Sequence, residues 1–260
     1  MTSAVPKTYR ERLKAIAQRA AYRAAQRSAD FMAYTSEHMR RLYQQNAGGR
    51  LARRGVVVYP GINDATHELA ERTRDPQAKD RNTILCVSVM ARWKNCETLI
   101  RAVRRLRDEN IPARLRLIGG WPDPVYRREI EIEIDRLGLK RHVTLEGHLS
   151  VQDLHAAYRS AGIYALLSKC ESFGIPAIEA QAFGTAVVGS STCAMPEIGG
   201  EGGIYVVPDD IDSTTSALNR LLTNDETWSL FAAKAIANAR RFRWETCSQP
   251  LQQIFVLRDN

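Results

Sequence analysis

From residue 80 onward, short apolar runs alternate with stretches whose apolar side chains recur every three or four residues. The first pattern predicts buried strands and the second predicts amphipathic helices. The predicted strands are Thr83–Val89, Arg114–Ile118, Val143–Leu145, Ile163–Leu167, Ala186–Val188 and Ile204–Val207. The predicted helices are Asn95–Asp108, Pro124–Leu137, Val151–Ala161, Pro176 to Gly184, and three in the tail from Asp212 to Arg258, broken near Asn224 and Phe242. Apolar strands that alternate with helices predict an α/β fold, a doubly wound, Rossmann-like parallel sheet covered on both faces.

The first 60 residues follow another pattern. Residues 8–29 predict a basic helix rich in alanine and arginine, and Ser36 is a suitable N-cap for a helix over Glu37–Gln45. Val56–Tyr59 predicts a strand. We therefore expect three parts: a basic helical extension at 1–60, a Rossmann-like domain at 61–241 and a closing helix at 242–260.

Composition narrows the function classes. Of 260 residues, 44% are hydrophobic and 25% charged, which excludes a disordered chain. Five cysteines without a CxxC pair argue against structural zinc and a disulfide framework, and fit a reducing cytoplasm. The net charge of +8 lies in the amino-terminal part: residues 1–59 carry 12 Lys or Arg against 3 Asp or Glu, and the rest 25 against 26. A basic nucleic-acid groove along the whole chain is therefore not expected.

The segment Ser168–Ala180 carries the most informative chemistry, because a strand ends there, a loop presents Glu171 and a short helix follows. Free amides at the helix start predict an anion site beyond the carboxyl ends of the strands. The amides expected to face it belong to Phe173, Gly174 and Ile175. Glu179, expected in the first turn, can accept both hydroxyls of a ribose. The simpler interpretation is one glutamate complementing the helix dipole and one solvated loop glutamate.

Three further segments follow strands at the same predicted edge. Arg92 and Lys94 place cations where a diphosphate needs neutralising without a metal, although a solvated basic turn has the same pattern. Gly147 lets the backbone approach a planar base. Ser191–Glu197 is a polar loop that can hold a sugar or a base, or be an ordinary loop.

Together these segments resemble the donor-binding half of retaining nucleotide-sugar glycosyltransferases of family four, which have the two-Rossmann-domain GT-B architecture. The similarity covers about residues 30–257. Glu171–Glu179 matches the family's motif of two glutamates separated by seven residues, and Lys94-Asn95 matches its phosphate-binding lysine segment. Val143–Gly147 resembles the base-binding loop, and Val56–Ile62 resembles the strand that links the two domains.

The resemblance implies a role for each matched position. Lys94 binds the donor diphosphate, Glu171 contacts the transferred sugar as the catalytic candidate, and Glu179 binds the ribose hydroxyls. The backbone amides of Phe173, Gly174 and Ile175 serve the phosphate or the sugar. The family's reaction retains the anomeric configuration through oxocarbenium-like charge, without metal or cofactor, from a UDP-, GDP- or dTDP-linked sugar.

Two departures from the family pattern leave two functions open. Ser88 and Val89 stand where many members have glycine and arginine, so Arg92 is the candidate replacement cation. Only the last helices and strand of an acceptor domain precede the donor half. The first function is a glycosyltransferase acting on a glycan or lipid-linked acceptor, either truncated or completed by a partner protein that carries the acceptor half. The alternative is a non-catalytic subunit that binds nucleotide sugar or acts as a scaffold.

The basic stretch at residues 7–27 suits attachment to an anionic membrane surface, at about 1 kcal/mol per cation. The protein would then be cytoplasmic and peripheral at the inner face of the membrane. A solvated helix whose partner domain is missing has the same pattern. Nucleic-acid binding through residues 7–54 is a weaker third hypothesis, because no aromatic stacking platform is present there, and we expect no nucleic-acid partner.

Overall fold

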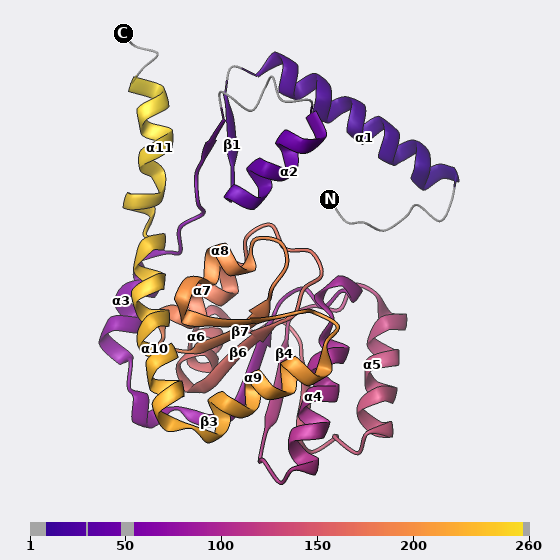
Figure 1. The fold of residues 1–260 in the computed structure, drawn as a ribbon, viewed down its shortest axis with the longest axis vertical. Coiled ribbons are helices and arrows are strands. Elements are labelled where there is room, and N and C mark those ends of the chain that lie inside the picture. The colour runs from indigo at the N-terminus through magenta and orange to yellow at the C-terminus, as the bar shows by residue number, and fades with distance from the viewer. Residues whose placement is uncertain (1–8, 30, 48–54, 257–260) are drawn as a thin grey trace.

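A six-stranded parallel sheet forms the centre of the computed structural model, which describes residues 9–29, 31–47 and 55–256. The strands lie in the order β5-β4-β3-β6-β7-β8 (Figure 1). Their bounds are β3 Asp80–Val87, β4 Arg114–Ile118, β5 Val143–Glu146, β6 Ala161–Leu166, β7 Ala186–Ser190 and β8 Gly203–Val206. Strand order reverses at β3, where the chain crosses from β5 to β6, so the predicted doubly wound fold is confirmed.

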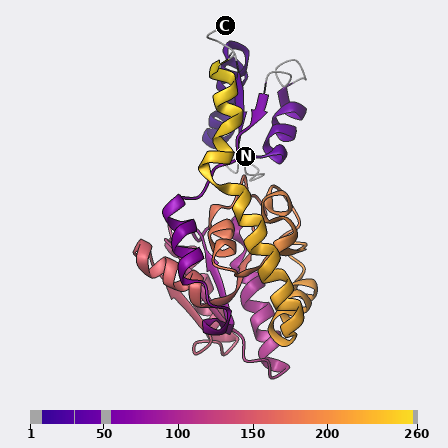
Figure 2. The ribbon, with the colours of Figure 1, turned by 90° about the vertical axis from the view of Figure 1, so that its left-hand side faces the viewer.

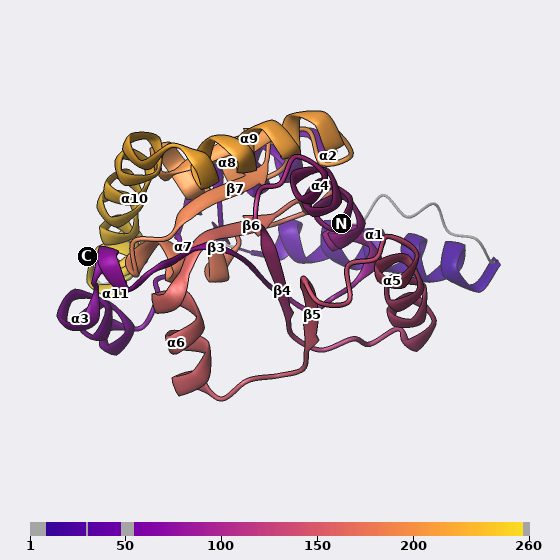
Figure 3. The same cartoon turned by 90° about the horizontal axis from the view of Figure 1, so that it is seen from below.

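Helices cover both faces of this sheet (Figure 3). One layer contains α4 (Cys96–Asp108), α5 (Pro124–Arg136) and α9 (Ile211–Thr223), and the other contains α3 (Asp64–Thr73), α6 (Val151–Ser160) and α7 (Ile175–Ala182). Every residue of β6 and β7 is buried, as expected for strands with helices on both sides. The predicted strands and helices are confirmed to within a few residues. The carboxyl ends of the parallel strands lie along one edge of the sheet.

Two short helices lie outside the predicted pattern. No helix was predicted over α3, although Asn63 accepts a hydrogen bond from the Ala65 amide as its N-cap. The helix buries only small or polar side chains, so it lacks a long apolar stripe. The short α8 (Met195–Gly199) begins within Ser191–Glu197, the segment we expected to be a polar loop, and ends two residues after it.

The amino-terminal residues form a separate small unit above the sheet (Figure 1). It contains α1 (Tyr9–Ser28), β1 (Met32–Tyr34), α2 (Glu37–Ala47) and β2 (Gly55–Val57), and β1 pairs in parallel with β2. Ser36 caps α2 as predicted, because its Oγ accepts the Met39 amide at 3.2 Å. Residues 7, 8 and 48–54, which belong to the predicted basic region, lie outside the described residues.

The tail returns to this unit. Helix α10 (Asp225–Ala239) packs on α7, and α11 (Trp244–Val256) continues past the sheet beside β2 (Figure 2). The Ile62 amide donates to the Phe242 carbonyl at 2.9 Å, so the segment that enters the sheet domain and the segment that leaves it are joined. The breaks predicted near Asn224 and Phe242 are confirmed.

Candidate nucleotide-sugar site

Lys94 ends a single 3-10 turn, η3 (Arg92–Lys94), that follows β3. The turn is fixed to the loop after β6, because the Trp93 carbonyl accepts the Lys169 amide at 2.8 Å. Asn95 adopts the left-handed conformation, with φ of 55°, and its Nδ2 donates to the Pro208 carbonyl at 2.5 Å. Asn95 therefore forms a buried turn that fixes the backbone immediately after Lys94.

The Lys94 side chain meets Glu171, one of the two predicted glutamates. Lys94 Nζ lies 2.5 Å from Glu171 Oε2, and the side chains are 14% and 13% exposed. The buried Ser168 hydroxyl also donates to Glu171 Oε2, at 3.4 Å. An ion pair this sheltered from water is stronger than a surface pair, yet it remains within reach of a competing anion.

The start of α7 supplies the predicted amides. Gly174 precedes the helix with φ of 105°, a left-handed conformation that favours glycine, and an added Cβ would lie 3.0 Å from Met195 Sδ. Pro176 has no N–H, and the backbone N–H groups of Phe173, Gly174 and Ile175 have no acceptor among residues 9–29, 31–47 and 55–256. These donors are therefore available to an anion.

Glu179 is the fifth residue of α7, so the prediction that it lies in the first turn was wrong. The helix starts at Ile175, which moves Glu179 into the second turn. Its Oε2 accepts the Tyr158 hydroxyl at 2.9 Å. Burial raises the pKa of Glu179, although the hydrogen bond from Tyr158 lowers it in part. Tyr158 was not predicted as a partner of Glu179, because it lies 21 residues away on α6.

Arg92 faces α5 rather than the Lys94–Glu171 pair. Its guanidinium forms two hydrogen bonds with Glu129, at 2.5 and 2.9 Å, and lies 4.8 Å from the centre of the Tyr126 ring. Asp123, the N-cap of α5, lies 3.5 Å from Arg92 Nε. The structure therefore does not bring Arg92 into contact with the other candidate residues.

A hollow of about 210 Å³ opens where β3, β4 and β5 end. Its lining comprises Val87, Ser88, Val89, Ile118, Gly119, His148, Leu149 and Leu154. Gly119 has φ of 138°, and a Cβ there would lie 1.9 Å from the Ser88 carbonyl oxygen, so only glycine fits. Gly147 is exposed beside this hollow, and a Cβ added to it would meet nothing within 4 Å.

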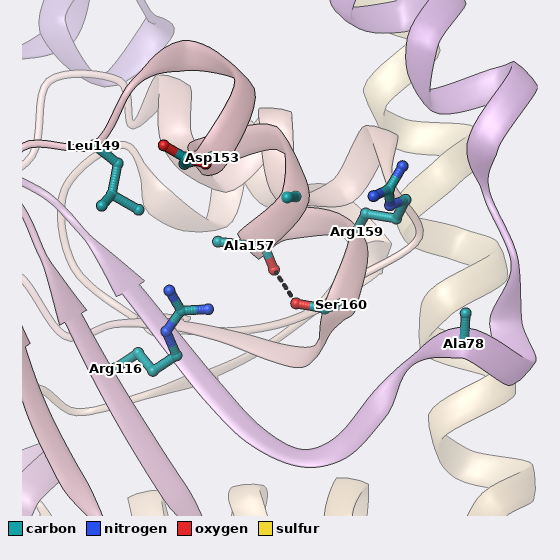
Figure 4. Close-up of a pocket in the computed structure, with 8 residues that line it drawn as sticks. Ala78, Arg116, Leu149, Asp153, Ala157, Arg159 and Ser160 are labelled. Carbon is teal, nitrogen blue, oxygen red and sulfur yellow. Dashed lines mark hydrogen bonds between the residues drawn. The ribbon is translucent and has the colours of Figure 1, made fainter.

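A larger hollow, about 620 Å³, lies away from these residues between α6 and β4 (Figure 4). Arg116, Asp153 and Arg159 contribute its charged side chains. Arg116 is already held by two hydrogen bonds of 2.8 Å to Glu146. Since none of the predicted site residues lines this hollow, we do not assign the donor to it.

Glu197 has a role that sequence reasoning missed. From α8, its carboxylate accepts the backbone N–H of Glu37 at 2.7 Å and of His38 at 2.9 Å, at the start of α2. Its Oε1 also accepts the Tyr59 hydroxyl at 3.0 Å. Burial and the Glu197 carboxylate together raise the pKa of Tyr59 to about 12. The predicted loop residue thus fastens the amino-terminal unit to the sheet domain.

A second bond of this kind reaches the Glu171 loop. The buried Ser36 hydroxyl donates to the Ser172 carbonyl at 3.0 Å. The Phe173 side chain packs against Tyr59 and Phe242, with ring centres 6.2 and 5.7 Å away. Phe173 is therefore anchored by its ring while its backbone faces the site.

The described residues contain neither a cluster of metal-binding side chains nor a membrane-spanning helix. No group of three or more His, Cys, Asp or Glu side chains among them could hold a metal ion. None of the helices in the described part of the chain is both long and apolar enough to cross a bilayer.

Comparison with known proteins places this site in context. The family model described as "Glycosyl transferases group 1" matches residues 69–242. D-inositol 3-phosphate glycosyltransferase of Corynebacterium diphtheriae is 31% identical over 77% of this chain and 50% of its own. O-antigen chain mannosyltransferase B of Escherichia coli is 30% identical over 63% of this chain and 43% of its own. The chain thus spans about half the length of these curated relatives.

Solved structures share the fold. HepE of Anabaena in complex with UDP and glucose superposes with a TM-score of 0.79 at 22% identity, over 92% of this chain and 66% of HepE. Sucrose-phosphate synthase of Thermosynechococcus elongatus gives a TM-score of 0.76 at 25% identity, over 93% of this chain and 61% of its own. The likeness to HepE extends over more of this chain than residues 69–242, the part that the family model matches.

Proposed function

The chain belongs to the glycosyl transferases group 1 family, and from this membership we propose that it binds a nucleoside-diphosphate sugar and forms the donor half of a retaining glycosyltransferase. The observation that carries the proposal is the Lys94–Glu171 ion pair beside the free amides of α7. The Lys94 ammonium, the Glu171 carboxylate and several free backbone N–H donors therefore lie close together.

The donor diphosphate would take the place of Glu171 as the partner of Lys94. Phosphate carries more charge than one carboxylate, and the amides at Phe173, Gly174 and Ile175 would donate to its remaining oxygens. Glu171, released from Lys94, would then accept hydroxyl groups of the transferred sugar. The pair therefore serves as a charge-balanced resting state of an anion site.

The nucleoside would extend from the diphosphate along the carboxyl ends of the strands. Glu179, held by Tyr158, would accept the ribose hydroxyls. The hollow lined by Ser88, Gly119 and His148 would receive the base, with the open backbone of Gly147 at its side. That hollow is large enough for a planar ring but offers few charged groups, as a base requires.

Transfer would need an acceptor bound above this edge, where β1, α2 and β2 lie. The amino-terminal unit contacts the site through Ser172 and Glu197, so groups on that side would approach the sugar. We propose that the acceptor is a glycan or a lipid-linked molecule, and that a partner carrying an acceptor domain completes the reaction. Leaving-group phosphate would accept the acceptor's proton on the same face, which keeps the anomeric configuration.

Titration calorimetry with UDP, GDP and dTDP tests donor binding. We expect saturable binding of one of them, weakened by Lys94→Met and unchanged by Lys234→Met, whose ammonium pairs with Glu201 on a distant surface. No saturable binding to any of the three would overturn the proposal. Two results together would favour the scaffold function instead. Nucleotide would still bind after Lys94 and Glu171 are both replaced, and no sugar would be transferred when a cell extract that contains acceptors is added.

The exposed cations of α1 favour an additional attachment to anionic lipid. Arg12, Lys14, Arg23 and Arg27 are all exposed. Flotation with vesicles of phosphatidylglycerol and phosphatidylcholine should carry the protein upward at low salt and release it at high salt. Equal flotation with phosphatidylcholine alone, or no dependence on salt, would contradict attachment through these cations.

A further inference from the structure

Two cysteines lie together at the wall of the candidate site. Cys193 Sγ donates to the Lys169 carbonyl at 3.5 Å, and the Ala194 amide donates to the Glu171 carbonyl at 3.2 Å. These two bonds flank Cys170, which lies between Lys169 and Glu171 in the chain. The loop after β6 and the turn after β7 therefore run side by side, with one cysteine on each.

These two thiols differ in setting from the others in the chain. Cys170 and Cys193 are half-buried, whereas Cys86, Cys96 and Cys247 are buried. Burial raises the pKa of the Cys170 thiol, and the neighbouring Cys193 raises it further. Cys193 also holds a left-handed φ of 58°, an uncommon conformation for a residue with a side chain.

We propose that Cys170 and Cys193 form a redox-sensitive thiol pair that closes to a disulfide between the two loops of the site. With hydrogen peroxide as oxidant, one thiol takes an oxygen atom to become a sulfenic acid and a water leaves. The second thiol then attacks that sulfur, and a second water leaves. Two thiols and one hydrogen peroxide are thus converted into one disulfide and two waters.

The disulfide would act on the donor site through Glu171, which directly follows Cys170. Joining Cys170 to Cys193 fixes the Glu171 loop against the turn after β7, and so alters the carboxylate that pairs with Lys94. We expect weaker nucleotide binding in the oxidised protein and recovery with dithiothreitol. This effect rests on the proposed function, but formation of the disulfide does not.

Peptide mass spectrometry of peroxide-treated protein tests the pair directly. We expect one cross-linked peptide containing Cys170 and Cys193, and a fall from five titratable thiols to three in the unfolded chain. Cys247→Ser should keep the cross-link and Cys193→Ser should abolish it. Persistence of all five thiols, or a disulfide that joins other cysteines or two chains, would overturn the proposal.

Calorimetry with the best-binding nucleotide separates this proposal from the function. Oxidised wild-type protein should bind at least tenfold more weakly than reduced protein, whereas Cys193→Ser should bind equally well in both conditions. Equal binding by cross-linked and reduced protein would refute control of the site by the pair. Failure of the reduced protein to bind any nucleotide would instead refute the donor site, while the mass measurement would still decide the disulfide.

Discussion

Glu197 Oε1 lies 2.7 Å from the backbone nitrogen of Glu37, at the first turn of α2. A carboxylate at a helix start satisfies free N–H donors and faces the positive end of the helix dipole. Here the carboxylate and the helix belong to parts of the chain 160 residues apart. This contact therefore orients the amino-terminal unit relative to the donor edge of the sheet.

Replacing Glu197 with glutamine should weaken the hydrogen bonds to α2 while keeping the size and shape of the side chain. Hydrogen bonds to a charged acceptor contribute about 1.5–3 kcal/mol, and a neutral amide keeps part of this, so we expect a loss of about 1 kcal/mol in the free energy of unfolding. Amide hydrogen exchange at residues 37–40 should accelerate. The matched control is Glu201→Gln, whose side chain is 84% exposed. Unchanged exchange at residues 37–40 would contradict the contact.

Lys94 and Glu171 should give opposite effects on nucleotide affinity. Lys94→Met removes a charge-assisted bond to diphosphate and should weaken UDP binding ten- to a hundredfold, which corresponds to about 1.5–3 kcal/mol. Glu171→Gln removes the competing carboxylate, so UDP should bind as tightly as before or more tightly. Calorimetry with each variant measures both. Equal losses in the two variants would mean that Glu171 does not compete with phosphate.

Glu179 should contribute to nucleotide binding only through the ribose hydroxyl groups. Glu179→Ala is expected to weaken UDP binding about tenfold or more, because two hydroxyl groups lose their acceptor. A dideoxy nucleotide, which lacks both hydroxyls, should bind the wild-type protein and the variant alike. If the variant weakens both nucleotides equally, Glu179 stabilises the fold of the site rather than the ribose contact.

Protonation of Glu179 in acid should weaken nucleotide binding and, in the same pH range, stabilise the folded state. Because burial raises the pKa of Glu179 above 4.5, the carboxylate gains a proton at a pH where an ordinary glutamate is still charged. The folded state then binds more protons than the unfolded state between 4.5 and the raised pKa. The contribution of Glu179 to stability therefore increases as pH falls through that window, while ribose binding decreases.

The pH profile of UDP affinity, with thermal melting at each pH, checks this prediction. The phosphates of UDP also gain protons, so Glu179→Gln provides the reference profile. Tyr158→Phe removes the hydrogen bond that favours the carboxylate, and should move the loss of binding to higher pH. Identical profiles for wild-type protein and Glu179→Gln would contradict the role given to this residue.

Much of the fold was predictable because it is encoded locally. Strand β4 was predicted at its observed bounds, since its alternating arginine and leucine residues end at a glycine turn, and α7 was predicted from Pro176 and Gly184 to within a residue or two. Lys94 and Glu171 were both expected at the carboxyl edge of the sheet, because each lies in a loop that follows a predicted strand. Their contact depends in addition on β3 and β6 being neighbours in the sheet, which the structure shows.

What the sequence could not predict depends on partners far along the chain. Arg92 was predicted to be a cation of the site, but in the structure it pairs with Glu129 of α5. The sequence pattern of α5 does not show that the face carrying Glu129 lies against Arg92. Glu197 reads as part of a polar loop, because its partners at Glu37 and Tyr59 lie in another unit. The position of a side chain can be predicted from the sequence when a neighbouring strand determines it. The role of a side chain cannot be predicted when its partner comes from a helix far along the chain.

The pairing of Ile62 with Phe242 and Arg243 means that two lengths of chain cross at one place between the sheet and everything above it. The upper part contains β2 and α11, and it is joined to the sheet domain at this crossing as well as through Ser36 and Glu197. These attachments lie at separate places, so they resist rotation of the upper part as well as its separation from the strand ends. Any group that the upper part carries is therefore held at a defined position relative to Lys94 and Glu171.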